Sequence, residues 1–313
     1  MTTKPSNPFH GVLVAVASPC DEQDVFQENR FSALCESMYD HGAHGLYVCG
    51  GTGDGYHMLL SERKRAIEIA VQVSRPHGGT VVDHVGTRNT RDSVALAEHA
   101  AQAGADGVSS MPPPLLSFEQ LHEFYREIAH AAQLPTIVYH IPMLTGVHLT
   151  AEEMIRLLDI DGVIGLKSTE WNLIYNKSIL RHRPDIVLYS GMDDVFVPAL
   201  LYGATGGIGM WYNFFPRAFA AMYQAVRDGN IESAMEVQSR FVDFSLYGWE
   251  FGMRAVFEHL SRQRGYGDYM FRRPRAALSG EAREELDRVL PARIEAIDAA
   301  VDACLAHAGR AAS

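Results

Sequence analysis

The chain has 313 residues, of which 47% are hydrophobic and 21% are charged, with 27 Lys and Arg against 38 Asp and Glu. The resulting net charge of −11 repels phosphate backbones and anionic lipids, so neither a nucleic-acid partner nor a membrane partner is expected. This length allows either one large α/β barrel or two smaller domains.

The cysteines and the apolar runs indicate in which cellular compartment the protein is expected. Cys20, Cys35, Cys49 and Cys304 show no Cys-x-x-Cys spacing and are too few for a disulfide scaffold. Residues 1–10 lack the apolar run of a secretory signal, and no apolar run long enough to span a bilayer occurs in the sequence. We therefore expect a cytoplasmic protein.

Short apolar or β-branched runs alternate with longer stretches of helical periodicity. The runs predict eight strands: Val12–Ser18, Gly45–Cys49, Thr80–Val85, Gly107–Met111, Thr136–Ile141, Gly162–Lys167, Ile186–Ser190 and Gly206–Met210. Helical patterns between them include Phe31–His41, Glu62–Ser74, Asp92–Ala103 and Leu121–Ala132. Strands that alternate with helices favour parallel βαβ units, and eight such units predict a closed (β/α)8 TIM barrel. A doubly wound open sheet is the alternative fold.

The last part of the chain differs, because no strand-like run follows residue 231. Three helices are predicted there: Ser233–Tyr247, Met253–Arg264 and Glu281–Ala308. We therefore expect residues 1–230 to form the catalytic barrel and residues 231–313 to form a C-terminal three-helix extension rather than an independent domain.

A few residues outside these runs also carry predictions. Ser117 and Gln120 have the spacing of a capping box, which predicts a helix start at that point. His44 is interpreted as a surface residue, and Trp171 and Trp211 are interpreted as pocket wall or core.

Lys167 ends an otherwise apolar predicted strand, and the carboxyl ends of the strands carry the active site in (β/α)8 barrels. Its amine is therefore expected to point into the barrel mouth. Burial disfavours the charged form, lowers the pKa of the amine from about 10.4 and leaves a nucleophile toward carbonyl groups. An ion-paired or surface lysine is the alternative interpretation.

Two neighbouring features fit the same chemistry. Tyr139 ends the adjacent predicted strand, where its phenol could move a proton to or from a bound substrate, although a core tyrosine fits equally. Residues 49–55, Cys-Gly-Gly-Thr-Gly-Asp-Gly, follow the second predicted strand, and backbone N–H groups of such a loop can converge on a carboxylate or phosphate. The loop lacks the spacing of Rossmann and Walker motifs, and a tight turn is the simpler interpretation.

Several motifs recur together in one order over about residues 10–230. They are Gly45–Asp54, Tyr139–Gly146, Gly165–Thr169, Gly191–Asp194 and Gly203–Gly209. Together they resemble the dihydrodipicolinate synthase/N-acetylneuraminate lyase family of class I, lysine-dependent aldolases, and most closely its N-acetylneuraminate lyase branch. The resemblance implies no metal, no organic cofactor and a homotetramer built as a dimer of dimers.

The resemblance also implies roles for individual residues. Lys167 would form an imine with C2 of a 2-oxo acid, typically pyruvate, and Tyr139 would transfer a proton while a carbon–carbon bond is cleaved or formed. Gly51 and Thr52 would hold the substrate carboxylate, with Thr52 also orienting Tyr139. The residues implied to contact the sugar-like remainder of the substrate are Thr169, Gly191, Asp193, Asp194 and Met210.

Several positions depart from the family pattern. Residues 111–115, Met-Pro-Pro-Pro-Leu, stand where paired aromatics usually supply a proton relay to a neighbouring subunit, so that relay is missing or rebuilt. Leu144 replaces an arginine of the synthase branch, which argues against dihydrodipicolinate synthesis. Gly51 and Met210 remove hydroxyl groups, which disfavours sialic acid and favours a neutral or less hydroxylated sugar acid, or an aryl-substituted partner.

Three other functions fit parts of the sequence. A dehydratase of a 2-oxo-3-deoxy sugar acid would use the same Lys167 imine and release water. A metal-dependent enzyme would draw on Asp83, His84, His140 and Asp193 near predicted strand ends. A sensory or transcriptional module would bind the 2-oxo acid without turnover. We predict the lysine-dependent aldolase.

Overall fold

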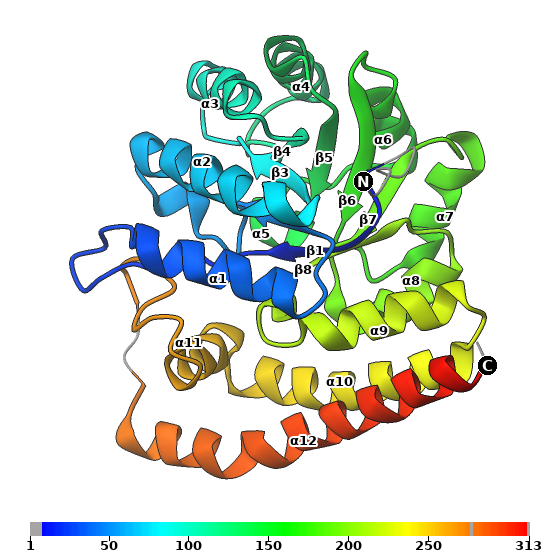
Figure 1. The fold of residues 1–313 in the computed structure, drawn as a ribbon. Helices are drawn as coiled ribbons and strands as arrows, with labels where there is room; N and C mark the ends of the chain where they lie inside the picture. The colour runs from blue at the N-terminus through cyan, green and yellow to red at the C-terminus, as the bar shows by residue number, and fades with distance from the viewer. Residues whose placement is uncertain (1–7, 276–277, 312–313) are drawn as a thin grey trace.

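The barrel is the central feature of the chain, whose computed structural model describes residues 8–275 and 278–311. Within these residues, parallel strands close into a barrel in chain order from β1 to β8 (Figure 1). The strands are β1 (Gly11–Ala15), β2 (Gly45–Val48), β3 (Thr80–His84), β4 (Gly107–Ser110), β5 (Thr136–His140), β6 (Val163–Ser168), β7 (Val187–Ser190) and β8 (Gly206–Gly209). The predicted (β/α)8 barrel is confirmed and the open sheet is wrong. Residues 1–7, part of the segment predicted to lack a secretory signal, lie outside the described residues.

Helices surround the barrel and connect its strands (Figure 1). They are α1 (Glu28–Asp40), α2 (Leu60–His77), α3 (Thr90–Ala103), α4 (Phe118–Ala132), α5 (Pro142–Thr145), α6 (Ala151–Leu158), α7 (Leu173–His182), α8 (Phe196–Leu201) and α9 (Pro216–Arg227). Short 3₁₀ turns follow three strands: η1 (Gly55–His57), η2 (Asp193–Val195) and η3 (Trp211–Asn213). The capping box predicted at Ser117 and Gln120 is confirmed at the start of α4.

Two apolar layers stabilise the barrel, one inside it and one between the strands and the helices. Because successive side chains of a strand face opposite sides, Val81 of β3 packs outward and Val82 packs toward the barrel axis. The same alternation at the carboxyl end of the barrel turns Tyr139 of β5 and Lys167 of β6 inward. These two residues are also paired in the register of the two strands.

The C-terminal extension consists of α10 (Ile231–Phe251), α11 (Met253–Gln263) and α12 (Gly280–Ala311), as predicted. Figure 1 shows α10 and α12 side by side below α9. Aromatic rings join the extension to the barrel, because Phe244 of α10 packs against Trp211 (ring centroids 5.0 Å apart) and against Phe215 (4.9 Å). This shared core packs the extension against the side of the barrel that contains β8.

Two single-residue interpretations need correction. His44 is half-buried, since its Nδ1 accepts a hydrogen bond from Val12 N (3.2 Å) and its ring packs on Tyr223 (5.3 Å). It lies just before β2, where the chain re-enters the barrel, rather than on the surface. Trp171 is 52% exposed and is therefore not part of the core, whereas Trp211 is buried at 1% exposure, as predicted.

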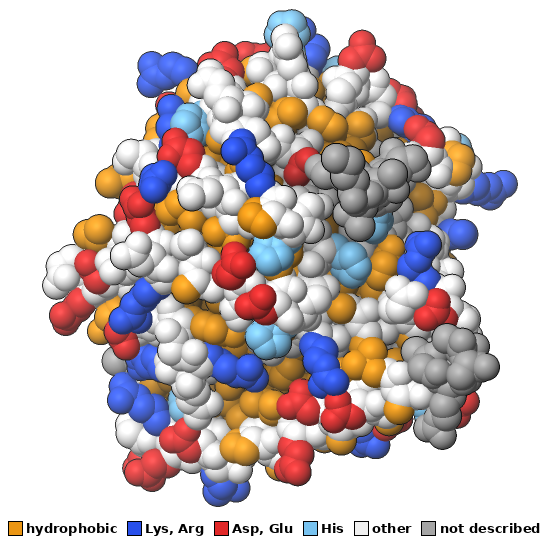
Figure 2. Space-filling model, viewed as in Figure 1, with side chains coloured by type: hydrophobic (Ala, Val, Ile, Leu, Met, Phe, Trp, Pro, Cys, Tyr) orange, Lys and Arg blue, Asp and Glu red, His pale blue; other side chains and the backbone are white. Residues whose placement is uncertain are grey.

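The surface mixes charges of both signs. Figure 2 shows acidic and basic side chains scattered over one face of the molecule, with apolar side chains between them. The excess of acidic residues is therefore not gathered into one patch on that face. Within the described residues, no helix is both long enough and apolar enough to cross a membrane.

Candidate active site

A cavity of about 300 Å³ lies at the carboxyl end of the barrel. Loops that follow β2, β5, β6, β7 and β8 contribute to its wall. All nine residues selected from the sequence line it: Gly51, Thr52, Tyr139, Lys167, Thr169, Gly191, Asp193, Asp194 and Met210. The fold thus brings together residues from five separate loops in one hollow.

Lys167 lies inside this cavity with only 3% of its surface exposed. Its Nζ is 4.0 Å from the centre of the Tyr139 ring and 4.5 Å from the centre of the Tyr47 ring. Burial lowers the pKa of the amine from 10.5 to about 7, although the charge of Asp193 opposes this shift. The surface-lysine interpretation is therefore wrong, and burial favours the uncharged amine.

Tyr139 is the nearest aromatic neighbour of that amine. Its ring makes edge contacts with Tyr47 (centroids 6.0 Å apart) and with His84 (6.2 Å), which restrict its orientation. Burial, assisted by the charge of Asp193, raises the pKa of the phenol, so the phenol carries its proton at neutral pH. Among the hydrogen bonds of the described residues, none joins Tyr139 to Thr52, and the ring contacts are what hold the side chain.

The glycine-rich loop after β2 is both a tight turn and a cavity wall. Asp54 adopts a left-handed conformation (φ 53°), and its backbone N–H donates to Gly51 O (3.2 Å). The Asp54 carboxylate bonds His57 Nδ1 (2.8 Å) and accepts from Arg272 N (2.8 Å), which ties the loop to the segment after α11. At Gly51 an added Cβ would meet only Leu144 Cδ2, at 4.0 Å, so the loop backbone borders open space there.

The wall opposite this loop is built at the ends of β6 and β7. The Thr169 hydroxyl donates to His140 O (3.0 Å), so its proton is already engaged. A Cβ at Gly191 would lie 2.7 Å from Thr169 Cγ2 and 3.2 Å from Lys167 Cε. Glycine at this position therefore leaves the space through which the Lys167 side chain runs.

Two carboxylates complete that wall. Asp193 Oδ2 accepts from Trp211 N (2.8 Å), and burial raises the pKa of this carboxyl to about 7. Asp194 Oδ2 lies 3.4 Å from the Trp249 indole nitrogen, which donates to it, while the buried Asp194 Oδ1 has no partner within the described residues. A buried acceptor without a partner is costly to the folded state, and Asp194 as a residue lines the cavity.

The sequence analysis missed the contribution of the C-terminal extension. Its cavity-lining residues are Trp249, Met253, Arg254 and Phe271. The Arg254 guanidinium lies over the Phe271 ring, 4.6 Å from its centre, and the side chain is exposed. These residues belong to helices and loops beyond the barrel, and no local sequence pattern indicates that they reach its mouth.

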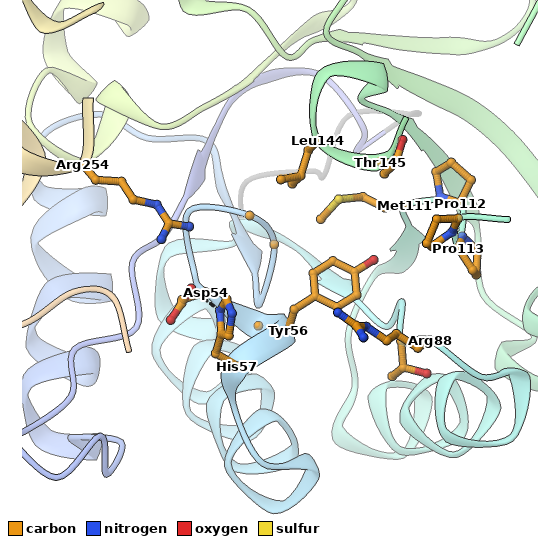
Figure 3. Close-up of a pocket in the computed structure, with 15 residues that line it drawn as sticks. Asp54, Tyr56, His57, Arg88, Met111, Pro112, Pro113, Leu144, Thr145 and Arg254 are labelled. Carbon is orange, nitrogen blue, oxygen red and sulfur yellow. Dashed lines mark hydrogen bonds and ion pairs between the residues drawn. The ribbon is translucent and has the colours of Figure 1, made fainter. Parts of the chain in front are cut away.

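A second cavity of about 240 Å³ adjoins the first, because Gly51, Leu144 and Arg254 line both. Figure 3 shows Tyr56 and Arg88 on one side of it and Met111 with Pro112 and Pro113 on another. Pro112, Pro113 and Pro114 thus form part of the wall of this neighbouring space and are not among the residues that line the cavity of Lys167.

The residues considered for a metal site do not converge. Asp83 and His84 are successive residues of β3 and face opposite sides, with the His84 ring against Tyr139 inside the barrel. His140 accepts from Leu149 N through its Nε2 (3.4 Å), away from the axis. Among the described residues, no three His, Cys, Asp or Glu side chains are placed to hold a metal ion.

Comparison with known proteins agrees with this geometry. The sequence profile of the "Dihydrodipicolinate synthetase family" matches residues 8–293. N-acetylneuraminate lyases of Salmonella paratyphi B and Salmonella typhimurium are each 37% identical to this chain over 234 residues, which is 74% of this chain and 78% of each relative.

Solved structures share the fold. CdNal from Clostridium difficile, solved in complex with mannosamine, matches with a TM-score of 0.84 at 24% identity, over 89% of this chain and 97% of its own. Dihydrodipicolinate synthase from Aquifex aeolicus matches with a TM-score of 0.84 at 25% identity, over 90% of this chain and 97% of its own. Members of this group are class I aldolases and lyases, and the chain belongs to the dihydrodipicolinate synthetase family.

Proposed function

We propose that this protein is a lyase that cleaves or forms a carbon–carbon bond between pyruvate and an aldehyde through an imine of Lys167. The observation that carries the proposal is the placement of this amine, which is buried in a cavity 4.0 Å from the Tyr139 ring with its pKa lowered to about 7. An uncharged amine attacks a ketone carbon, whereas an ammonium ion does not. The likeness to N-acetylneuraminate lyases supports the same chemistry.

The reaction begins when the Lys167 amine adds to C2 of a 2-oxo acid and the resulting carbinolamine loses water. The product is a protonated imine. In cleavage, the C3–C4 bond breaks and its electron pair moves toward the imine nitrogen. The C4 hydroxyl loses its proton, and the fragment that contains C4 leaves as an aldehyde. The remaining enamine takes at C3 the proton that Tyr139 received from the C4 hydroxyl, and water then hydrolyses the imine to release pyruvate and the free amine.

Tyr139 is the proposed proton carrier. Its raised phenol pKa keeps the proton in place until a stronger base forms beside it, as the departing hydroxyl of the carbinolamine does. The phenolate left by that transfer is then able to take the C4 hydroxyl proton during cleavage. In the condensation direction the phenol gives its proton to the oxygen of the aldehyde.

The remaining residues are proposed to hold the substrate. Backbone N–H groups at Gly51 and Thr52 would bind the carboxylate of the 2-oxo acid, since this loop borders open space in the cavity. The rest of the substrate would contact the opposite wall, formed by Thr169, Gly191, Asp193, Asp194 and Met210.

A dehydratase of 2-oxo-3-deoxy sugar acids is the second candidate. The observation that favours it is the proline segment of residues 112–114, which has no side-chain proton to pass to Tyr139. In that reaction a C3 proton is removed from the imine and the C4 hydroxyl leaves as water, with the same nitrogen accepting the electron pair.

Product analysis tests both candidates. A panel of 2-oxo-3-deoxy sugar acids is incubated with the wild-type protein and with Lys167→Ala, and the products are identified by mass spectrometry. The aldolase proposal predicts pyruvate and an aldehyde from the wild-type protein and no turnover from folded Lys167→Ala. Loss of water without pyruvate would assign the dehydratase, and turnover by Lys167→Ala above about a tenth of the wild-type rate would contradict imine catalysis in either form.

A homotetramer is proposed as the working assembly, from the family resemblance and from the exposed apolar residues near the barrel mouth. Leu115 is fully exposed, and Met143 and Leu144 are 69% and 57% exposed. They follow the neighbouring strands β4 and β5, and exposed apolar side chains favour burial against another surface. Light scattering tests the proposal, with four times the chain mass of 34.6 kDa as the expected result and a monomer as the contradicting one.

A further inference from the structure

We propose that Arg254 selects substrates whose far end carries an anionic oxygen group, a carboxylate or a phosphate, so that the aldehyde half of the reaction is an acidic aldehyde. This inference rests on the function proposed above and names its substrate class. It differs from the neutral sugar acid expected from the sequence, because that expectation did not include residues of the extension.

The first argument is position. Arg254 lies near the start of α11 and lines the same cavity as Lys167 and Tyr139. It also lines the second cavity, so it stands where the two spaces meet. In Figure 3 its side chain extends from α11 toward the loop that carries Asp54 and His57. A substrate bound to Lys167 that extends outward along the cavity would bring its far end to this junction.

The second argument is the lack of a partner. Arg254 forms no ion pair or hydrogen bond with any residue in the described part of the chain, and its guanidinium rests on the Phe271 ring. Among the described residues that line the two cavities, the carboxylates of Asp54, Asp193 and Asp194 form no ion pair with it. Asp54 bonds His57 and Arg272 N, and Asp193 accepts from Trp211 N. A protein with 38 acidic residues against 27 basic ones leaves this arginine without a counter-ion at the cavity.

The third argument is the set of complementary groups in the cavity. Asp194 lines the cavity, and its carboxylate is able to accept a hydrogen bond from a hydroxyl group of the substrate. Arg254, on a different element, offers a planar set of donors that matches a carboxylate or phosphate in two parallel hydrogen bonds. An acceptor and a cation that line the same cavity fit a hydroxylated 2-oxo acid with a second anionic group.

The expected size of the effect follows from charged hydrogen bonds. Such a bond contributes about 1.5–3 kcal/mol, which corresponds to about 10–100-fold in kcat/KM between an acidic substrate and its neutral counterpart. The phenyl ring of Phe271 holds the guanidinium without neutralising it, so the full charge remains available to the ligand.

The test measures condensation of pyruvate with matched aldehydes. Tartronate semialdehyde and glyceraldehyde differ only in a carboxylate against a CH₂OH group. Mannuronate and mannose differ in the same way but have longer carbon chains. Glyceraldehyde 3-phosphate supplies the phosphate. The wild-type protein is expected to prefer the anionic member of at least one pair by about 10-fold or more in kcat/KM. A preference for the carboxylates or for the phosphate alone would identify the group that Arg254 binds.

Variants assign the preference to this side chain. In Arg254→Gln the ratio of kcat/KM between the anionic and the neutral aldehyde is expected to fall to about one, and Arg254→Lys is expected to retain part of the preference. Arg181→Gln, on the exposed last turn of α7, removes the same charge away from the cavity and is expected to leave the preference intact.

Two results would overturn the inference. One is equal use of both members of every pair by the wild-type protein, and the other is an unchanged preference in Arg254→Gln. Reductive trapping of pyruvate on wild-type protein and Arg254→Gln runs alongside, because the trapping does not depend on the aldehyde. A trapped adduct without an anionic preference would reject the role of Arg254 alone, whereas absence of the adduct would reject the proposed function itself.

Discussion

At Lys167, burial in an aromatic environment creates the reactivity that the proposed chemistry needs. The rings of Tyr47 and Tyr139 replace water around the ammonium group, and the resulting cost lowers the pKa of the amine to about 7. The Asp193 carboxylate limits the shift, since its charge favours the protonated form. The pKa of Asp193 is itself raised, chiefly by burial.

The rate of imine formation with pyruvate should therefore depend on pH around neutrality. Below pH 7 the amine is mostly protonated, and the rate is expected to fall about 10-fold per pH unit because only the uncharged form attacks the ketone. Above pH 8 the rate should level off. Reductive trapping of pyruvate, stopped at successive times and repeated at a series of pH values, measures the rate of imine formation. A rate that keeps rising to pH 10 would mean that the amine has the pKa of an exposed lysine.

Tyr139 should matter for proton transfer more than for binding. Tyr139→Phe keeps the ring that contacts Tyr47 and His84 but removes the phenol. We expect kcat to fall by about 10²-fold or more, the usual scale for a positioned proton donor, and trapping of pyruvate on Lys167 to become slower without being abolished. Steady-state kinetics and the trapping assay measure the two effects. Near-normal kcat would assign the proton transfer to another group.

At the scale of elements, the strands position the two proposed catalytic side chains, and the loops determine the space around them. Lys167 and Tyr139 face the same interior because they are paired across β5 and β6. The turn between β7 and η2 then decides how much room the lysine has. Gly191 lies in this turn, where Thr169 Cγ2 and Lys167 Cε surround the site of a missing Cβ.

A methyl group at that turn should displace the lysine. In Gly191→Ala the new Cβ would be 2.7 Å from Thr169 Cγ2, so the neighbouring side chains must shift. Because a displacement of about 1 Å can cost about 10²-fold in rate, we expect kcat to fall by at least 10-fold in a folded protein. Gly280→Ala, where no heavy atom lies within 4 Å of the added Cβ, is the matched control. Unchanged kcat in Gly191→Ala would show that the lysine tolerates the shift.

The difference between local and distant contacts explains which elements and site residues could be predicted from the sequence. Periodicity found all the barrel strands of the described region, and strand-end position selected Lys167 and Tyr139, because both signals are local. The resemblance to a family supplied the cavity residues in the loops. Arg254 and Trp249 could not be found in this way, since their approach to the mouth depends on contacts distant in sequence, such as the bond between Asp54 and Arg272, which are separated by 218 positions.

For the whole molecule, the buried amine of Lys167 lowers the free energy of unfolding. In the unfolded chain Lys167 would be protonated with a pKa near 10.4, whereas in the folded protein its pKa is about 7. The folded state thus binds fewer protons between these values, and its stability increases as the pH rises from 7 toward 10. At pH 7 and below, the cost approaches about 4 kcal/mol in the free energy of unfolding.

Replacing the lysine with an apolar side chain of similar size should remove that cost. We expect Lys167→Met to be inactive yet to unfold at a higher temperature than the wild-type protein at pH 7, with a smaller difference at pH 9.5. Thermal unfolding at the two pH values measures this. Lys177→Met, at an exposed position of α7, is the control and should change the midpoint little at either pH. A destabilised Lys167→Met at pH 7 would contradict the account of a buried, costly amine.

Reductive trapping of pyruvate tests the central claim most directly. The sequence contains only four lysines, Lys4, Lys64, Lys167 and Lys177, so the modified position can be assigned by peptide mass spectrometry after treatment with pyruvate and borohydride. The account predicts one reduced pyruvate per chain, located on the peptide that carries Lys167. Protein that remains unmodified, or that carries the adduct on another lysine while Lys167 stays free, would contradict it.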